Sequence, residues 1–366
     1  MKRRTLLGGS VAGGMALGGA EALGSSSQTE VADSARSALP PGVIASAYAV
    51  PHSEYGQFGT PDYFAYANDL VIERHRQGKP HQGKVLAAIQ AHSDDIPIFC
   101  GGTVAKLINE GYTGYLIRLT NDESGPVGDR GPNWTLGHGV VQSQFDNDAV
   151  AKALGCKKAF SLGYQNHRAD EDAVIEIRAR LIFLFRLLQV NTVVTYDPYN
   201  QYEENPDHSV LSNAVQGACW MAGEERDYPE HFKAGLKLGG VREKYYVGRA
   251  ARGHNTINRV VDISSYIDVK VRANVAYKDK GAAGDAGLRL KRALAGQGKK
   301  LPLLGDDDDT ANFNYVKHFL MGDNRVLGAQ YGLEFAEAFH YIGPPTSGPS
   351  ARESRQKYID SHVVPL

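Results

Sequence analysis

Short apolar runs alternate with longer amphipathic segments along most of this chain. The short runs are typical of buried strands, which we expect over residues 84–89, 114–119, 159–162, 192–196, 244–247 and 259–263. Apolar residues recur at helical spacing in the segments between them. Helices are therefore predicted over residues 98–110, 140–154, 173–189, 206–221 and 267–277.

This alternation of strands and helices predicts an α/β fold with a mostly parallel sheet that helices cover on both faces. Sheets of this kind bind ligands at the carboxyl ends of their strands. The sequence therefore directs attention to the residues just after Ile89, Leu119 and Tyr196.

One segment, residues 281–310, breaks the pattern because it is rich in Gly, Lys and Asp. We predict a loop-like insertion there. It includes the run Asp306–Asp309, which is more typical of a solvated loop than of a calcium site. The run lacks the alternating spacing and the central glycine of a calcium-binding loop.

The charges of the chain nearly cancel, with 40 basic and 41 acidic residues among 366. Proteins that bind nucleic acids usually carry a basic excess or a basic stripe, and this sequence has neither. We therefore expect no nucleic-acid partner. The three cysteines contain no C-x-x-C pair and do not describe a disulfide framework.

The N-terminus resembles a twin-arginine export signal, because Arg3 and Arg4 precede an apolar stretch over residues 6–23. Ala20-Glu21-Ala22 is a candidate cleavage site. The stretch is too short and too rich in glycine for a membrane span. The sequence thus predicts an exported protein, periplasmic or extracellular, without stable membrane insertion once the signal is removed.

A dense polar cluster, His92-Ser93-Asp94-Asp95, follows the first predicted strand. Buried without partners these side chains would be costly, and a metal ion bound by His92 and Asp95 would remove that cost. A catalytic zinc ion usually takes three protein ligands. His208 is the candidate third ligand, because Asn205-Pro206-Asp207-His208 follows the fourth predicted strand, with Asp207 orienting the site.

Either cluster alone could serve in helix capping or salt bridging. Two clusters at the same predicted edge of the sheet favour the metal site.

These motifs resemble those of the PIG-L/LmbE-like zinc-dependent de-N-acetylases, in which Ala-His-Pro-Asp-Asp comes early and His-Pro-Asp-His late. Further similarity lies in residues 119–125, 193–198, 261–264 and 335–339 and at Lys270. The resemblance covers residues 83–342, most of the chain beyond the predicted signal. It implies a Rossmann-like three-layer sandwich, with its metal site at the carboxyl ends of the strands, that removes N-acetyl groups from amino sugars.

The resemblance also assigns roles to individual residues. His92, Asp95 and His208 match the metal ligands, and Asp94 matches the general base. Tyr202 matches a tyrosine that family members place near the developing oxyanion.

Three departures from the family pattern stand out. Ser93 replaces a proline, which changes the stiffness of the loop and not a ligand. Asn205 replaces a histidine that helps to stabilise the oxyanion, and asparagine can donate a hydrogen bond but cannot be cationic. Ser143 and Asp146 stand where the family often has Arg and Glu, which points to a different substrate.

The predicted organisation is a signal and tether over residues 1–40, an N-terminal extension over 41–82, a de-N-acetylase-like domain over 83–345 and a tail over 346–366. Zinc is the favoured cofactor, but two histidines and one carboxylate also suit Fe(II). The expected partner is a small molecule or glycan that carries an N-acetyl group. The resemblance also implies that identical chains can assemble, although the sequence shows no interface signature.

Two other functions compete with the hydrolase. A glycan-binding protein on the same fold would explain Asn205 and Ser143, but it would need no general base such as Asp94. A nucleotide-dependent oxidoreductase is disfavoured, because no Gly-x-Gly-x-x-Gly turn follows the first strand. The remaining histidines His138, His167 and His254 are more typical of surface or core positions than of a site.

Overall fold

The structure is a computed structural model, and it describes residues 43–44, 70–123, 133–199, 203–248, 257–278, 283–343 and 351–365. The predicted signal and tether over residues 1–40 lie outside the described residues. No helix in the described ranges combines the length and the apolar character needed to cross a membrane.

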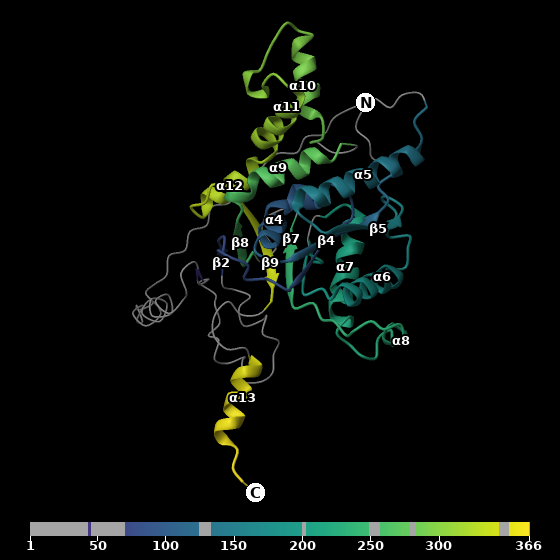
Figure 1. Ribbon diagram of the computed structural model, residues 1–366, viewed down its shortest axis with the longest axis vertical. Coiled ribbons are helices and arrows are strands. Elements are labelled where there is room, and N and C mark those ends of the chain that lie inside the picture. The colour runs from purple at the N-terminus through teal and green to yellow at the C-terminus, as the bar shows by residue number, and fades with distance from the viewer. Residues whose placement is uncertain are drawn as a thin grey trace, which may run out of the picture. The chain divides into compact units, whose positions relative to one another are not determined.

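A nine-stranded sheet forms the centre of the fold (Figure 1). Its strands are β1 (Val43–Ile44), β2 (Leu70–Glu73), β3 (Val85–Gln90), β4 (Thr113–Thr120), β5 (Lys158–Tyr164), β6 (Thr192–Tyr196), β7 (Glu243–Val247), β8 (Arg259–Asp262) and β9 (Ala336–Ile342). They lie in the order β1-β2-β8-β9-β7-β6-β3-β4-β5. Strands β3 to β7 are parallel to their neighbours in this group, β9 runs antiparallel between β7 and β8, and β1 is antiparallel to β2. The predicted α/β fold with a mostly parallel sheet is confirmed.

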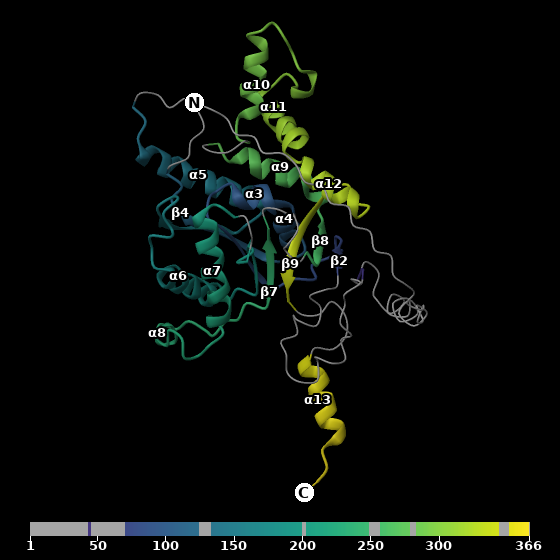
Figure 2. The same ribbon diagram turned by 180° about the vertical axis from the view of Figure 1, so that it is seen from behind.

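Helices lie on both faces of this sheet, as Figures 1 and 2 show from opposite sides. The helices of the described ranges are α3 (Asp95–Phe99), α4 (Gly101–Asn109), α5 (Leu136–Leu154), α6 (Val174–Leu188), α7 (Pro206–Met221), α8 (Glu230–Lys233), α9 (Ile267–Ala276), α10 (Ala286–Ala295), α11 (Asp308–Tyr315), α12 (Gly322–Gln330) and α13 (Ala351–His362). Two short 3₁₀ segments and one π-helical turn complete the described elements: η2 (Ser264–Tyr266), η3 (Pro302–Leu304) and η4 (Val316–Leu320).

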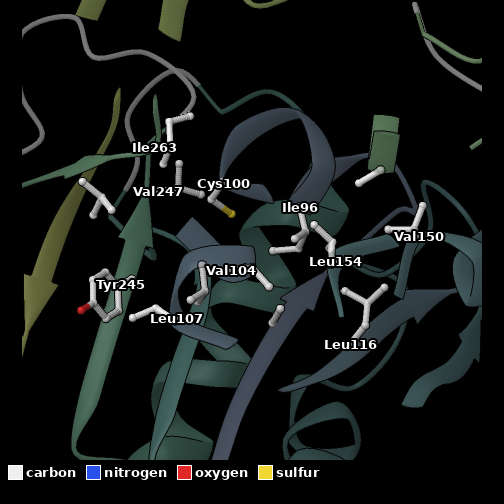
Figure 3. Packing of buried hydrophobic residues seen from close by; sticks show 14 of the residues in the cluster. Ile96, Cys100, Val104, Leu107, Leu116, Val150, Leu154, Tyr245, Val247 and Ile263 are labelled. Carbon is white, nitrogen blue, oxygen red and sulfur yellow. The ribbon is translucent and has the colours of Figure 1, made fainter. Parts of the chain in front are cut away.

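Successive side chains of the central strand β3 point into two different cores, as the two-residue period of a strand requires. Leu86 and Ala88 pack with helices α4, α5 and α9, whereas Ala87 and Ile89 pack with α6 and α7. Figure 3 shows the first of these cores. There Val104 and Leu107 of α4 lie against Tyr245 of the sheet. One core lies on each face of the sheet, so the sheet and the helices on its two sides form the three layers of the Rossmann-like sandwich.

The helix predicted over residues 98–110 is broken in the structure. Cys100 leaves the helical conformation, with φ −147° and ψ 19°, and separates α3 from α4. The break brings the start of α4 close to β8 and β9, since a Cβ atom at Gly102 would lie 2.8 Å from Ile263. The Glu337 carboxylate then accepts hydrogen bonds from the backbone N–H groups of Gly102 (3.1 Å) and Thr103 (2.7 Å).

Glu337 also pairs with Lys270 at 2.6 Å, and both side chains are fully buried. A carboxylate at the N-terminus of a helix is favoured by the unpaired N–H groups and by the helix dipole. Lys270 and the segment around Glu337 are among the positions at which the sequence resembles the de-N-acetylase family. In the structure they hold α4 in place, and α3 joins α4 to the loop after β3.

The loop prediction for residues 281–310 is wrong in part. Residues Ala286–Ala295 form helix α10, because Ala, Leu, Lys and Arg are strong helix formers and outweigh the flanking glycines. The acidic run starts helix α11. Asp307 is its N-cap, and its side chain accepts a hydrogen bond from the backbone of Thr310, so the carboxylates lie at the positive end of a helix.

Strand β2 was not predicted, and a buried ionic cluster ties it to the sheet. Glu73 accepts hydrogen bonds from Lys106 of α4 (2.9 Å), Arg259 of β8 (2.7 Å) and Tyr245 of β7 (3.0 Å). Burial raises the pKa of Glu73, but the charges of Lys106 and Arg259 outweigh burial and lower it to about 2. Within residues 41–82, predicted as an extension, the described segments β1 and β2 therefore both belong to the main sheet.

We expect Glu73→Gln to lower the free energy of unfolding at pH 7 by about 3–5 kcal/mol, because it leaves the Arg259 and Lys106 charges buried with fewer partners. The pKa of Glu73 is lower in the folded chain than its ordinary 4.5, so its stabilisation is complete above about pH 4.5 and is lost as the pH falls toward 2. The difference between the two proteins should therefore shrink below about pH 4.5. Chemical denaturation of the metal-free proteins tests this, with Glu334→Gln on the surface as the control. A difference that stays constant as the pH falls would contradict the role of Glu73.

Candidate metal centre

The candidate centre lies where the strand order of the sheet reverses. Strand β3 has β4 on one side and β6 on the other, so the chain leaves β3 toward one edge and later returns to its opposite flank. Such switch points open a crevice at the carboxyl ends of the two strands. His92 and Asp95 follow β3, and His208 lies in the first turn of α7, which follows β6.

Three side chains from these two segments converge. His92 Nδ1 lies 3.2 Å from His208 Nε2 and 3.6 Å from Asp95 Oδ2, and His208 Nε2 lies 3.4 Å from Asp95 Oδ1. The three residues are buried, with 4–5 % of their surfaces exposed. Within the described ranges they form the one group of His, Cys, Asp or Glu whose ligand atoms converge closely enough to hold a metal ion.

Each imidazole has a carboxylate behind it, at the nitrogen that faces away from the shared point. His92 Nε2 lies 2.9 Å from Asp207 Oδ2, and His208 Nδ1 lies 3.2 Å from Glu203 Oε1. Carboxylates in this position fix the orientation and the tautomer of metal-binding histidines and raise their basicity. Asp95 is fixed as well, because its Oδ2 accepts hydrogen bonds from the backbone N–H groups of Ala91 (3.0 Å) and His92 (2.8 Å).

The carboxylates give the centre a strong preference for positive charge. Burial lowers the pKa of His92, but Asp207 and Asp95 outweigh burial and raise it to about 10. In the same way Asp95 and Glu203 raise the pKa of His208 to about 9. Burial raises the pKa of Asp95, yet His208 and His92 hold it well below its ordinary range. The carboxylates around the two rings thus favour a cation at this point.

The geometry of the three atoms fits a small divalent ion. Ligand atoms about 2.0–2.2 Å from a tetrahedral zinc ion lie roughly 3.3–3.6 Å from one another. The two histidine nitrogens are 3.2 Å apart, and each lies 3.4 or 3.6 Å from one of the two Asp95 oxygens, so the spacing is of this order. A set of two histidines and one carboxylate leaves a position for water or substrate, as catalytic zinc sites do. The same set also suits Fe(II), so the donors do not select one metal.

Asp94 lies beside the ligands in the same turn. It is the N-cap residue of α3 and is half-buried. Burial and Asp95 raise the pKa of Tyr196 well above its ordinary value, and the charge of Asp94 adds to this rise. The hydroxyl of Tyr196 is 3.3 Å from His208 Nε2, and its ring stacks on that of His208 with centroids 4.1 Å apart. Asp94 therefore lies within electrostatic reach of the ligand cluster.

Ser93, which stands where the family has proline, is held from two sides. Its hydroxyl accepts a hydrogen bond from the buried Arg118 at 2.6 Å, and its backbone N–H donates to Asp122 at 3.1 Å. Arg118 also donates to the carbonyl of Ser143 at 2.9 Å. These contacts replace the stiffness that a proline would give to the turn between His92 and Asp94.

Of the two residues predicted to stabilise an oxyanion, the structure describes Asn205 but not Tyr202. Tyr202 lies outside the described residues, and its role stays a prediction. Asn205 is the N-cap of α7, where its side-chain oxygen accepts a hydrogen bond from the backbone of Asp207 at 3.0 Å. Asp207, predicted to orient the site, contacts His92 from the opposite segment.

Three residues near the centre were missed from the sequence: Glu203 behind His208, Tyr196 stacked on it, and His167 beside His92. The rings of His167 and His92 are 5.6 Å apart and meet edge-on. Tyr196 is the last residue of a predicted strand and Glu203 is five residues before His208, so proximity to the motif was the one signal available. His167 carried no such signal, because its loop reaches the site only through the fold.

Comparison with known proteins agrees with this geometry. Residues 87–219 match the profile of the family described as PIG-L: GlcNAc-PI de-N-acetylase. This segment is therefore similar to the domain that defines that family. The matched segment contains the predicted base and all three candidate ligands, and its boundaries run from β3 to the end of α7.

Relatives to which the chain is similar are named deacetylases. The chain is 26% identical over 193 residues to diacetylchitobiose deacetylase of Thermococcus kodakarensis. The aligned region covers 52% of this chain and 67% of that protein. The chain is 29% identical over 164 residues to 1D-myo-inositol 2-acetamido-2-deoxy-alpha-D-glucopyranoside deacetylase of Rhodococcus opacus, which covers 38% of this chain and 55% of that protein. The chain thus spans between about half and two thirds of the length of these relatives.

The fold of the chain also has solved counterparts. N,N'-diacetylchitobiose deacetylase from Pyrococcus horikoshii superposes with a TM-score of 0.55 at 19% identity, over 74% of this chain and 90% of that one. At this identity the likeness concerns the fold. The Rossmann-like sandwich predicted from the sequence is therefore confirmed.

We expect Asp207→Asn to weaken zinc binding about 10–100-fold, because an amide cannot match the carboxylate that fixes the His92 ring. Competition with a chromophoric chelator measures this. Asp197→Asn is the matched control, since Asp197 is a buried aspartate after β6 that accepts a hydrogen bond from the backbone of Tyr199 at 2.8 Å and pairs with His340 at 3.3 Å, not with a candidate ligand. Equal zinc affinities for wild type and Asp207→Asn would contradict the role of Asp207.

Proposed function

We propose that this protein is a metal-dependent hydrolase that removes the N-acetyl group from an amino sugar or a sugar-like molecule. The observation that carries the proposal is the buried convergence of His92, Asp95 and His208 at the switch point, with Asp94 beside them in the same turn. A centre that served only to hold the fold together would need no additional carboxylate at its rim.

The relatives support the reaction and the class of substrate. Both named enzymes remove acetyl groups from 2-acetamido sugars, one from a disaccharide and one from a sugar linked to inositol. We propose a 2-acetamido sugar as the substrate class of this chain too. The backbone carbonyl of Ser143 in α5 accepts a hydrogen bond from Arg118. Its side chain is a serine where family members often have arginine, so we expect the contact of α5 with the substrate to differ from theirs.

His92, Asp95 and His208 would hold the metal, and zinc is favoured. When bound, such an ion supplies a Lewis acid that polarises the acetyl carbonyl and lowers the pKa of water. Asp94 takes the proton from the attacking water and later delivers it to the departing amine. Asp207 and Glu203 keep the two rings in the orientation that presents one nitrogen to the shared point.

Stabilisation of the oxyanion is assigned to Tyr202 and Asn205. The side-chain oxygen of Asn205 is engaged in the cap of α7, so its amide nitrogen is the group that we expect to donate to the substrate. A hydrogen-bond donor aimed at developing negative charge commonly contributes 10²–10³-fold in rate.

A glycan-binding protein on the same fold remains the competing function. It would bind the acetamido sugar without releasing acetate.

Export by the twin-arginine route, to the periplasm or the cell exterior, is likewise part of the proposal, and it rests on Arg3 and Arg4.

We expect Asp94→Ala to retain metal and to lose about 10²–10⁴-fold in kcat, because it removes the general base and none of the ligands. Acetate release from N,N'-diacetylchitobiose, N-acetylglucosamine and the inositol-linked acetamido sugar measures activity, and elemental analysis measures metal. Asp148→Asn on the exposed side of α5 is the control. An Asp94→Ala protein as active as the wild type would overturn the assignment, and a wild type that binds these sugars without releasing acetate would establish the binding protein.

A further inference from the structure

His167 has an unusual backbone conformation for a residue with a side chain. Its φ is 59°, in the left-handed region, which non-glycine residues seldom occupy. Within the described ranges it shares this property with Asp122, Gln189 and Tyr228. Residues in such conformations persist where the surrounding structure holds them, and they cluster at functional sites.

The loop between β5 and α6 is held in this shape by two carboxylates of the candidate site. The backbone N–H of His167 donates to Asp207 at 2.7 Å, and that of Ala169 donates to the other oxygen of Asp207 at 3.0 Å. The N–H of Asn166 donates to the carboxylate of Glu123, with distances of 3.1 and 3.2 Å. The position of the loop is thus tied to the residue that orients His92.

The side chain of His167 lies at the boundary between the centre and solvent. His92 is 5% exposed, whereas His167 is an exposed residue whose ring meets the His92 ring edge-on at 5.6 Å. The imidazole of an exposed residue thus meets the ring of a buried candidate ligand, on the side of His92 that faces the β5–α6 loop. A substrate that approaches the cluster from this side passes the imidazole.

The backbone alone does not account for a histidine here. Both contacts that fix the loop to Asp207 are made by backbone N–H groups, which any residue except proline supplies. Glycine would adopt the left-handed conformation without a steric penalty. The imidazole thus occupies a position that glycine would fill with less backbone strain.

We infer that His167 is a further catalytic residue, which hydrogen-bonds a polar group of the acetamido sugar next to the scissile amide. An imidazole can both donate and accept a hydrogen bond, and sugar hydroxyl and acetamido groups offer both kinds of partner. The inference rests on the proposed function, and it adds a substrate contact from the β5–α6 loop to those expected from the two metal-site motifs.

Two substitutions separate the side chain from the backbone. His167→Gly removes the ring, and glycine adopts the left-handed conformation without a steric penalty. The protein should therefore stay folded and keep its zinc affinity. We expect its kcat/KM to fall about tenfold or more, the effect of losing one hydrogen bond to the substrate. His167→Asn, which tolerates the left-handed conformation and keeps a hydrogen-bonding group, should recover part of the loss.

Gln189→Gly is the matched control. Gln189 is also exposed and left-handed, with φ 56°, but it ends α6 and bonds to Arg186 and Lys237 away from the centre. Its activity should equal that of the wild type. Calorimetric titration of N,N'-diacetylchitobiose into zinc-loaded Asp94→Ala protein, with and without His167→Gly, gives a second readout that does not require turnover. We expect the added substitution to weaken binding about tenfold.

Wild-type activity and wild-type sugar binding in His167→Gly would overturn the inference and leave the proposed function intact. Loss of zinc from His167→Gly would also overturn it, because the ring would then shield the metal site and not contact the substrate. Absence of acetate release by the wild type would instead overturn the proposed function, and the inference with it.

Discussion

Buried negative charge at one edge of the sheet is the constraint on which the site depends. Asp95, Asp207 and Glu203 surround two imidazoles in a space that water barely reaches, and such charges are costly unless cations neutralise them. Protons on His92 and His208 can meet this need, as their raised pKa values indicate. A divalent ion meets it better, since it also satisfies the two nitrogens and the carboxylate oxygen that converge between the rings.

The fold brings these groups together by a chain of buried contacts. Adjacent strands β3 and β6 fix the separation between the two ligand-bearing segments. The break at Cys100 lets Glu337 and Lys270 hold the start of α4, which in turn anchors the short helix that begins at Asp95. The fixed segments thus set the positions of His92, Asp95 and His208 before any ligand binds, which is the arrangement that catalytic sites require.

Much of this was predictable from the sequence, because the ligands sit at strand ends within short motifs. The period of the apolar residues located β3 and β6, and the rule for parallel sheets then placed His92 and His208 together. Helix α10 was missed, since flanking glycines hid a segment of strong helix formers. The helix break at Cys100 was also missed, although two glycines follow it, because the carboxylate that binds the start of α4 belongs to Glu337, far along the chain. The edge-on contact of His167 with His92 depends on how two carboxylates fold a loop, which no local pattern encodes.

The central claim is that the converging His92, Asp95 and His208 hold a metal ion that the deacetylation requires. The most direct test is to purify the chain without added metal, determine bound metals by elemental analysis, and assay the same sample for acetate release with and without a chelator. The account predicts about one zinc or iron ion per chain and acetate release that the chelator abolishes and added metal restores. A chain that takes up no metal after reconstitution, or that releases acetate equally well with the chelator present, would contradict it.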